Sequence, residues 1–244
     1  MFRIIRSEWL KYQWGLFFLF VIVDAGVNAG LGALSTRDYK EVFETGWDTF
    51  FMHSVTFHTL FFYPFYTGLF ASMLCYYEYK DGGWKHLFTL PIPRIQIYSS
   101  KLVLLLTLMG FTQLFFLSAY LLSGYMLKLP GEIPVAMMLK HTLAGWLAVF
   151  PLASFQLWMA QKIRTFGLSI MFNILCVVPN LVLTGLHSSI GAWFPFTLPY
   201  YAMFPQHTSL SPRLDLLPFL FIAAFTFILY LFIGSRQFIR HEIH

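Results

Sequence analysis

Polar side chains stand inside apolar segments of this chain. Asp24 and Asn28 share the first long apolar segment, and a charged group near the centre of a membrane helix costs about 2.5–3.5 kcal/mol on insertion scales. Asp24 is therefore expected to face protein or water. Two interpretations stay open: a polar lining of a translocation path, and a hydrogen-bonded structural carboxyl nearer the membrane interface. For Gln113, Gln156 and Asn173, hydrogen bonds between helices are the simpler interpretation.

The sequence contains no recognisable catalytic or nucleotide-binding set. No Gly-x-x-x-x-Gly-Lys-Ser/Thr phosphate loop occurs, so any ATP-driven action needs a separate ATPase. Ser and Thr residues lack an accompanying His/Asp set for nucleophilic catalysis. The histidines form no His-Glu-x-x-His motif, and we interpret them as solvated or interfacial groups and not as metal ligands. The histidines considered as possible ligands are six of the eight in the sequence: His53, His58, His86, His141, His241 and His244.

Residues 78–90 are predicted to form a short cytoplasmic helix that runs along the membrane surface. Gly82 and Gly83 permit a bend after the second apolar segment, because glycine reaches backbone angles that other residues avoid. Pro91 and Pro93 make continuation of the helix unfavourable and set its far end.

The apolar residues of this segment recur at helical spacing. Trp84, Leu87 and Phe88 could present one apolar face, with Lys85 as a charged contact at its edge. Glu78 could pair with a basic residue of a partner or anchor the loop within the chain, and the sequence favours neither. The competing interpretation is an amphipathic segment that lies among lipid headgroups.

The composition excludes a water-soluble fold. Hydrophobic residues make up 58% of the chain and charged residues 11%, whereas soluble domains carry about 25% charged residues. Aromatic residues make up 20%, which suits lipid-facing helices with interfacial anchors. The net charge of +5 comes from basic residues scattered between apolar segments, so a nucleic-acid partner is not expected.

Six apolar segments have about the length of a bilayer crossing, which needs roughly 20 residues. They are 14–34, 54–77, 102–127, 141–160, 166–186 and 216–234. Residues 187–215 contain four prolines, so they cannot form one continuous helix, and we expect short outer re-entrant or interfacial helices there. The predicted fold is an all-α integral membrane protein with about six transmembrane helices. Residues 1–244 form a single transmembrane domain in this interpretation.

The distribution of basic residues predicts the topology. With the N-terminus in the cytoplasm, only Arg37, Lys40, Lys128, Lys140 and Arg213 of the 16 basic residues lie outside. Cytoplasmic loops carry an excess of Lys and Arg, so this asymmetry favours two cytoplasmic termini and an even number of crossings.

The segment that begins at Glu78 resembles the first cytoplasmic loop of ABC-2 type exporter permeases. In that family the loop resembles Glu-x-x-x-Gly-x-Trp-Lys-x-Leu-x-x-Leu-Pro followed by a basic residue. The matching positions are Glu78, Gly82, Trp84, Lys85, Leu87, Leu90, Pro91 and Arg94. The six spans, the basic N-terminal helix and the polar C-terminal end extend the resemblance over most of the chain. Size and loop style are similar to permeases for lantibiotic immunity or bacitracin-type peptide export.

The resemblance implies a permease subunit without a cofactor of its own, in a bacterial plasma membrane. ABC ATPase subunits would bind ATP and magnesium and would dock on the loop as a cytoplasmic coupling helix between the first pair of spans and the third span. The residues assigned to this loop are Glu78, Gly82, Gly83, Trp84, Lys85, Leu87 and Phe88. A second copy or a related permease, membrane lipid, and an amphipathic peptide antibiotic or lipid-like substrate are the other expected partners.

Two rival functions have less support in the sequence. A secondary transporter or channel would use Asp24 as an ion or proton site, but no inverted repeat is evident and intramembrane charges are few. An intramembrane enzyme would need a nucleophile, base or metal site that we cannot assemble from these residues.

Overall fold

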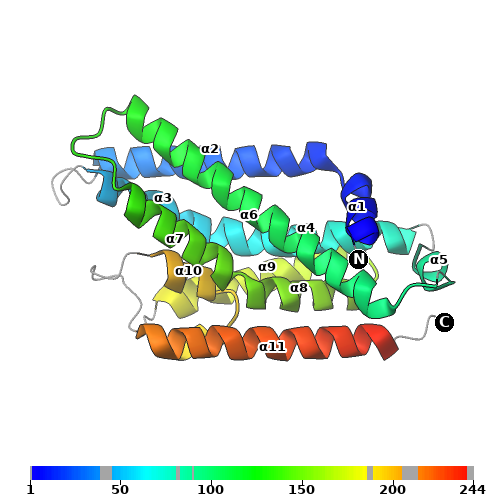
Figure 1. The fold of residues 1–244 in the computed structure, drawn as a ribbon. Coiled ribbons are helices and arrows are strands. Elements are labelled where there is room, and N and C mark those ends of the chain that lie inside the picture. The colour runs from blue at the N-terminus through cyan, green and yellow to red at the C-terminus, as the bar shows by residue number, and fades with distance from the viewer. Residues whose placement is uncertain are drawn as a thin grey trace.

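The computed structural model describes residues 2–38, 46–80, 83–89, 91–185, 189–204 and 214–240, and every regular element in these ranges is a helix. The predicted all-α fold is confirmed. Figure 1 shows the longer helices side by side, with α6 crossing the others obliquely. The order is α1 (Phe2–Lys11), α2 (Trp14–Asp38), α3 (Trp47–Phe57), η1 (His58–Phe62), α4 (Tyr63–Lys80), α5 (Gly83–Thr89), α6 (Arg94–Met126), α7 (Val135–Ala148), α8 (Phe150–Lys162), α9 (Phe166–Gly185), η2 (Ser189–Trp193), α10 (Leu198–Met203) and α11 (Leu216–Arg240).

Five helices of the described residues are long and apolar enough to cross a membrane. Each overlaps a predicted span, and the third of them comprises α7 and α8 together. They are Trp14–Asp38, Arg94–Met126, Val135–Lys162, Phe166–Gly185 and Leu216–Arg240. The chain is therefore a multi-pass membrane protein. The helix α6 begins at Arg94, eight residues before the predicted span 102–127, and Lys101 in this first part of the helix is buried.

The predicted span 54–77 lies in a helix that is interrupted. From Trp47 to Lys80 the chain runs through α3, η1 and α4, and η1 is a five-residue π-helical segment. Such segments break the regular α-helical hydrogen-bond pattern. Glu8 and Glu78 lie at the same end of the bundle, because both contact Lys101. This interrupted helix therefore leads the chain back along α2.

The first helix and the C-terminal end of the last helix lie at the same end of the bundle. In Figure 1, α1, α5 and the C-terminal end of α11 lie at the same end. The ring of Trp84 in α5 packs on Phe238 in α11, with centroids 5.4 Å apart. Both ends of the described chain thus lie at one end of the bundle. The even number of crossings and the assignment of that end to the cytoplasm stay predictions.

Short helices follow α9, as the prolines predicted. The structure contains η2 and α10 there, and Leu198, Tyr200 and Tyr201 of α10 are buried. These side chains pack in a cluster with Trp47 and Phe50 of α3. The helix α10 is therefore enclosed by protein, whereas Ile190 and Trp193 of η2 are exposed.

The outer surface of the bundle is apolar. On α11, Leu217, Phe221, Ile228 and Phe232 are all exposed. A water-soluble protein rarely exposes contiguous apolar patches of this kind. Polar side chains instead lie between the helices, where partners from other helices can satisfy them.

The C-terminus of α6 closes with a lysine in an unusual conformation. The N–H of Leu129 donates to the carbonyl of Gly124 at 3.2 Å, and the N–H of Lys128 donates to that of Tyr125 at 3.1 Å. This is the Schellman arrangement, whose left-handed residue is usually glycine. Lys128 occupies that position with φ of 51°.

Lys128→Gly is expected to raise the free energy of unfolding by about 0.5–1 kcal/mol, because glycine adopts this conformation without the Cβ clash. The matched opposite change is Gly131→Ala, which should lower it by about 1 kcal/mol because Gly131 has φ of 90°. Thermal unfolding midpoints in detergent micelles measure both. A lower midpoint for Lys128→Gly would contradict the expectation.

Candidate functional site

A buried ammonium group joins three helices beneath α5. The Nζ of Lys101 in α6 donates to Glu8 Oε2 at 2.6 Å, to the carbonyl of Leu74 at 2.8 Å and to Glu78 Oε1 at 3.3 Å. Lys101 is 0% exposed, and Glu8 in α1 and Glu78 in α4 are also buried. All three ammonium protons thus have acceptors, as a buried charge requires.

A second lysine balances the remaining negative charge of this cluster. The Nζ of Lys11 lies 3.4 Å from Glu78 Oε1 and 3.9 Å from Glu8 Oε1, and its side chain is 47% exposed. Two carboxylates and two ammonium groups leave the cluster neutral. We call Glu8, Lys11, Glu78 and Lys101 the charge cluster. Next to it, burial raises the pKa of Tyr12, so its hydroxyl stays uncharged.

The short helix α5 rests directly on the charge cluster. A Cβ on Gly83 would come within 2.5 Å of Glu78 Oε2 and 3.1 Å of Glu78 Cα, so only glycine permits this approach. Trp84 is 7% exposed, and the Lys101 Nζ lies 5.5 Å from the centre of its ring. The Trp84 ring also packs on Tyr79 at 5.7 Å and on Phe238 at 5.4 Å.

The structure corrects several details of the predicted segment 78–90. Glu78 belongs to α4. Of the two alternatives, a basic residue of a partner or an anchor within the chain, the structure shows the second, because Glu78 contacts Lys101 and Lys11. Trp84 faces the chain's own interior, where a partner cannot reach it in this conformation, because the cation of Lys101 and the ring of Phe238 hold it there. Leu87 is partly buried on the same core.

Three predicted positions of this segment are not fully described. Gly82 lies outside the described residues, as do the side chains of Lys85 and Phe88. The coupling role of the segment stays a prediction.

A second polar site lies inside the bundle around Asp24. The Oδ2 of Asp24 is 3.0 Å from Nδ1 of His58 in η1, and Asn28 Nδ2 donates to Asp24 Oδ1 at 2.7 Å. Asp24 and His58 are both 0% exposed, and the His58 ring stacks on Phe116 at 4.1 Å. The expectation that Asp24 faces the interior is confirmed, and a role in a translocation path stays a prediction.

The interpretation of His58 as a solvated or interfacial group was wrong. Its partner Asp24 is 34 positions away in the chain, so only the packing of η1 on α2 brings the two together. His58 and Glu78 are separated by about 30 Å of helix, so the Asp24 site and the charge cluster are distinct. Within the described ranges no group of three or more His, Cys, Asp or Glu side chains is placed to hold a metal ion.

Amide side chains connect other helices, as predicted. Gln156 Nε2 in α8 donates to Asn173 Oδ1 in α9 at 2.8 Å. Gln113 Nε2 in α6 lies 3.1 Å from the sulfur of Met203 in α10. Asn180, which was not singled out, donates to the carbonyl of Leu60 at 2.7 Å.

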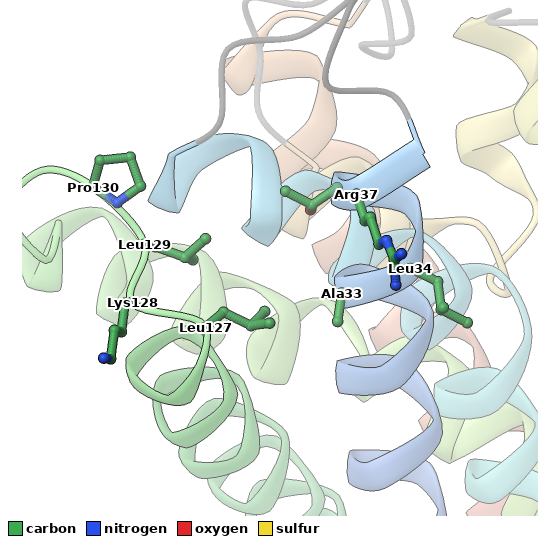
Figure 2. A pocket seen from close by; sticks show the side chains of 8 residues that line it. Ala33, Leu34, Arg37, Leu127, Lys128, Leu129 and Pro130 are labelled. Carbon is green, nitrogen blue, oxygen red and sulfur yellow. The ribbon is translucent and has the colours of Figure 1, made fainter.

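A pocket of about 460 Å³ lies between the C-terminal ends of α2 and α6, far from α5. Figure 2 shows Leu127 and Leu129 on one side of it and Ala33, Leu34 and Arg37 of α2 on the other. None of the predicted site residues lines this pocket.

Lys101→Met should lower the free energy of unfolding by about 3–5 kcal/mol, because it leaves two buried carboxylates without their main partner. Lys11→Met is the matched control. It removes the same charge from the same cluster at a half-exposed position, where an ion pair contributes at most about 1 kcal/mol. Chemical unfolding in detergent micelles measures both, and equal effects would contradict the assignment of Lys101 as the central cation.

Comparison with known proteins places the chain in a family. A family model described as ABC-2 family transporter protein matches residues 4–180, which include α1, the charge cluster, α5 and the Asp24 site. No curated protein matches the sequence. Because the matched residues cover well over half of the sequence, the chain belongs to the ABC-2 family of transporter proteins, as a membrane permease component.

Proposed function

We propose that the chain is the permease subunit of an ATP-driven exporter and that a separate ATPase acts on it through α5. The observation that carries this proposal is the position of α5 on the charge cluster. Through Gly83 and Trp84, α5 contacts Glu78 and Lys101, and Lys101 in turn holds Glu8. A force on α5 therefore reaches α1, α4 and α6 together.

The electrostatics of the charge cluster favour its movement as one unit. Separating Lys101 from Glu8 or Glu78 would leave a buried charge without a partner, which costs several kcal/mol. Tilting the attached helices together keeps these ion pairs intact. We propose that ATP binding closes the ATPase pair and moves α5. The helices then shift between inward-open and outward-open arrangements, because the closed ATPase pair binds one arrangement more tightly than the other.

The burial of Trp84 changes its proposed role. Because its ring packs on Phe238 and against the Lys101 ammonium group, we assign it to positioning α5 and not to direct docking. The docking contacts would come from the side of α5 opposite Trp84. Lys85 stays the charged contact that the sequence predicts. Two permease subunits, identical or related, would work with two ATPase subunits in a bacterial plasma membrane with both termini cytoplasmic.

The proposed substrate is an amphipathic peptide antibiotic that is expelled for self-protection. The resemblance of the loop to lantibiotic and bacitracin-type permeases supports this choice. Asp24 and Asn28 are enclosed between α2 and η1, so we propose that they line the path only when these elements part.

The Asp24–His58 pair favours a second candidate, a secondary transporter that uses an intramembrane ionisable site. Uptake or efflux by proteoliposomes that contain the permease alone, without ATPase, would support it.

Lys85→Glu should reduce ATPase association and substrate-stimulated ATP hydrolysis about tenfold or more, since like charges across an interface cost several kcal/mol. The matched control is Arg236→Glu, which makes the same charge change at an exposed position on α11, outside α5. Co-purification and ATP hydrolysis measure both. Equal behaviour of the two variants would remove α5 from the coupling role.

Cells that express the permease with its ATPase should tolerate a higher concentration of bacitracin than cells with the ATPase alone. The growth-inhibitory concentration measures this effect. An ATPase variant that binds but cannot hydrolyse ATP is the control. Unchanged tolerance to bacitracin and to lantibiotic peptides would contradict the proposed substrate class.

A further inference from the structure

The interrupted helix has a proline at its π-helical segment. Pro64 is the second residue of α4 and is separated from the end of η1 only by Tyr63. Proline has no N–H, so the α-helical hydrogen bond from residue 64 to the carbonyl of Leu60 cannot form. In a membrane, an unsatisfied backbone carbonyl is costly and must find a donor elsewhere.

A side chain of another helix supplies that donor. The Nδ2 of Asn180 in α9 donates to the carbonyl of Leu60 at 2.7 Å, and Asn180 is fully buried. Asn180 follows Pro179, which interrupts the hydrogen bonds of α9 in the same way. Two proline-weakened helices thus meet at this one bond.

The opposite side of η1 is also held. His58, the first residue of η1, contacts Asp24 of α2 at 3.0 Å and stacks on Phe116 of α6 at 4.1 Å. The π-helical segment therefore lies between a bond to α9 and contacts to α2 and α6. Sharp bends in helices occur at prolines and π-helical segments, so this is the weakest point of the path from α3 to α4.

We infer that η1 is the pivot on which α4 and the charge cluster turn during transport, and that Asn180 is the positioning residue that sets the resting angle. The motion rests on the proposed function, whereas the bond of Asn180 to the freed carbonyl does not. Asn180 acts through the backbone of Leu60, and Pro64 is what makes that carbonyl available.

The bond is tested by a double-mutant cycle on the full chain in detergent micelles. Asn180→Leu should lower the thermal unfolding midpoint by roughly 5 °C, because it removes a side-chain donor from a buried carbonyl that cannot receive its α-helical bond from Pro64. In the Pro64→Ala background the loss should be less than half as large, because the restored N–H at position 64 can bond to Leu60. Pro64→Ala alone is expected to fold, since it restores a donor.

Asn173 provides the matched control for this cycle. It is a buried asparagine of the same helix, and its Nδ2 donates to the carbonyl of Phe65 at 2.7 Å. That carbonyl does not depend on an N–H at position 64, so Asn173→Leu should cost the same in both backgrounds. An equal loss for Asn180→Leu in both backgrounds would overturn the assignment of Asn180.

The pivot is tested by a distance across η1 in the complex with the ATPase. Spin labels on Asp48→Cys in α3 and Tyr77→Cys in α4, in a chain with Cys75→Ala and Cys176→Ala, report the angle between the two helices. The distance should shift by several ångströms between the nucleotide-free and the vanadate-trapped states, and Pro64→Ala should abolish most of the shift.

ATP hydrolysis on the same samples separates the two ideas. An unchanged distance in a complex with permease-stimulated hydrolysis overturns the pivot and leaves the proposed function standing. Failure of the permease to bind or stimulate the ATPase overturns both, and it is recognised by the hydrolysis measurement itself.

Discussion

The buried ammonium of Lys101 is the interaction on which this end of the molecule depends. A charge without water must be neutralised and fully hydrogen-bonded, and Lys101 achieves this with one carboxylate from α1, one from α4 and a backbone carbonyl. The need to neutralise this charge holds α1 and the C-terminal end of α4 against α6. It also fixes α5, because Gly83 contacts Glu78 and Trp84 covers the ammonium group.

The same rule explains the rest of the interior. The outer surface is apolar because it faces lipid, so polar groups that would otherwise be solvated are paired between helices. Asp24 contacts His58 and accepts a hydrogen bond from Asn28. Asn173 accepts one from Gln156, and the carbonyl of Leu60 accepts one from Asn180. Each pair joins elements that could move relative to one another, apart from Asn28 and Asp24 within α2. The bundle is thus a set of apolar surfaces held in register by a few specific polar contacts.

Five apolar helices and the burial of Asp24 could be predicted from the sequence, because bilayer thickness and the cost of a charge in lipid act on each segment separately, whereas the predicted span 54–77 is not among the five helices long and apolar enough to cross a membrane. Partners could not be predicted in this way. Lys101 and Glu8 are 93 positions apart, so the sequence suggested only a cytoplasmic lysine near a helix start. The burial of Trp84 inside the chain could not be predicted for the same reason. Helical spacing identifies an apolar face but does not show which residues cover it.

Some missed features had a signal in the sequence. Pro64 stands inside the predicted span 54–77, and a proline within a helix predicts a kink or a local change of hydrogen bonding. Asn180 lies next to Pro179, so an amide beside a second helix break was visible as well. By contrast, nothing in the sequence indicated that Gly83 would be pressed against Glu78, because that contact depends on the angle at which α5 leaves α4.

The central claim is that the buried ion pairs transmit the movement of α5 to the helices. The most direct test replaces all three buried members at once, with Glu8→Leu, Glu78→Leu and Lys101→Met, because apolar replacement of a whole buried ionic group often preserves folding. Transport per ATP hydrolysed is then measured in proteoliposomes with the partner ATPase, with circular dichroism as the check on folding. The account predicts a folded permease that still binds the ATPase but transports far less substrate per ATP. Wild-type transport per ATP in that variant would contradict it.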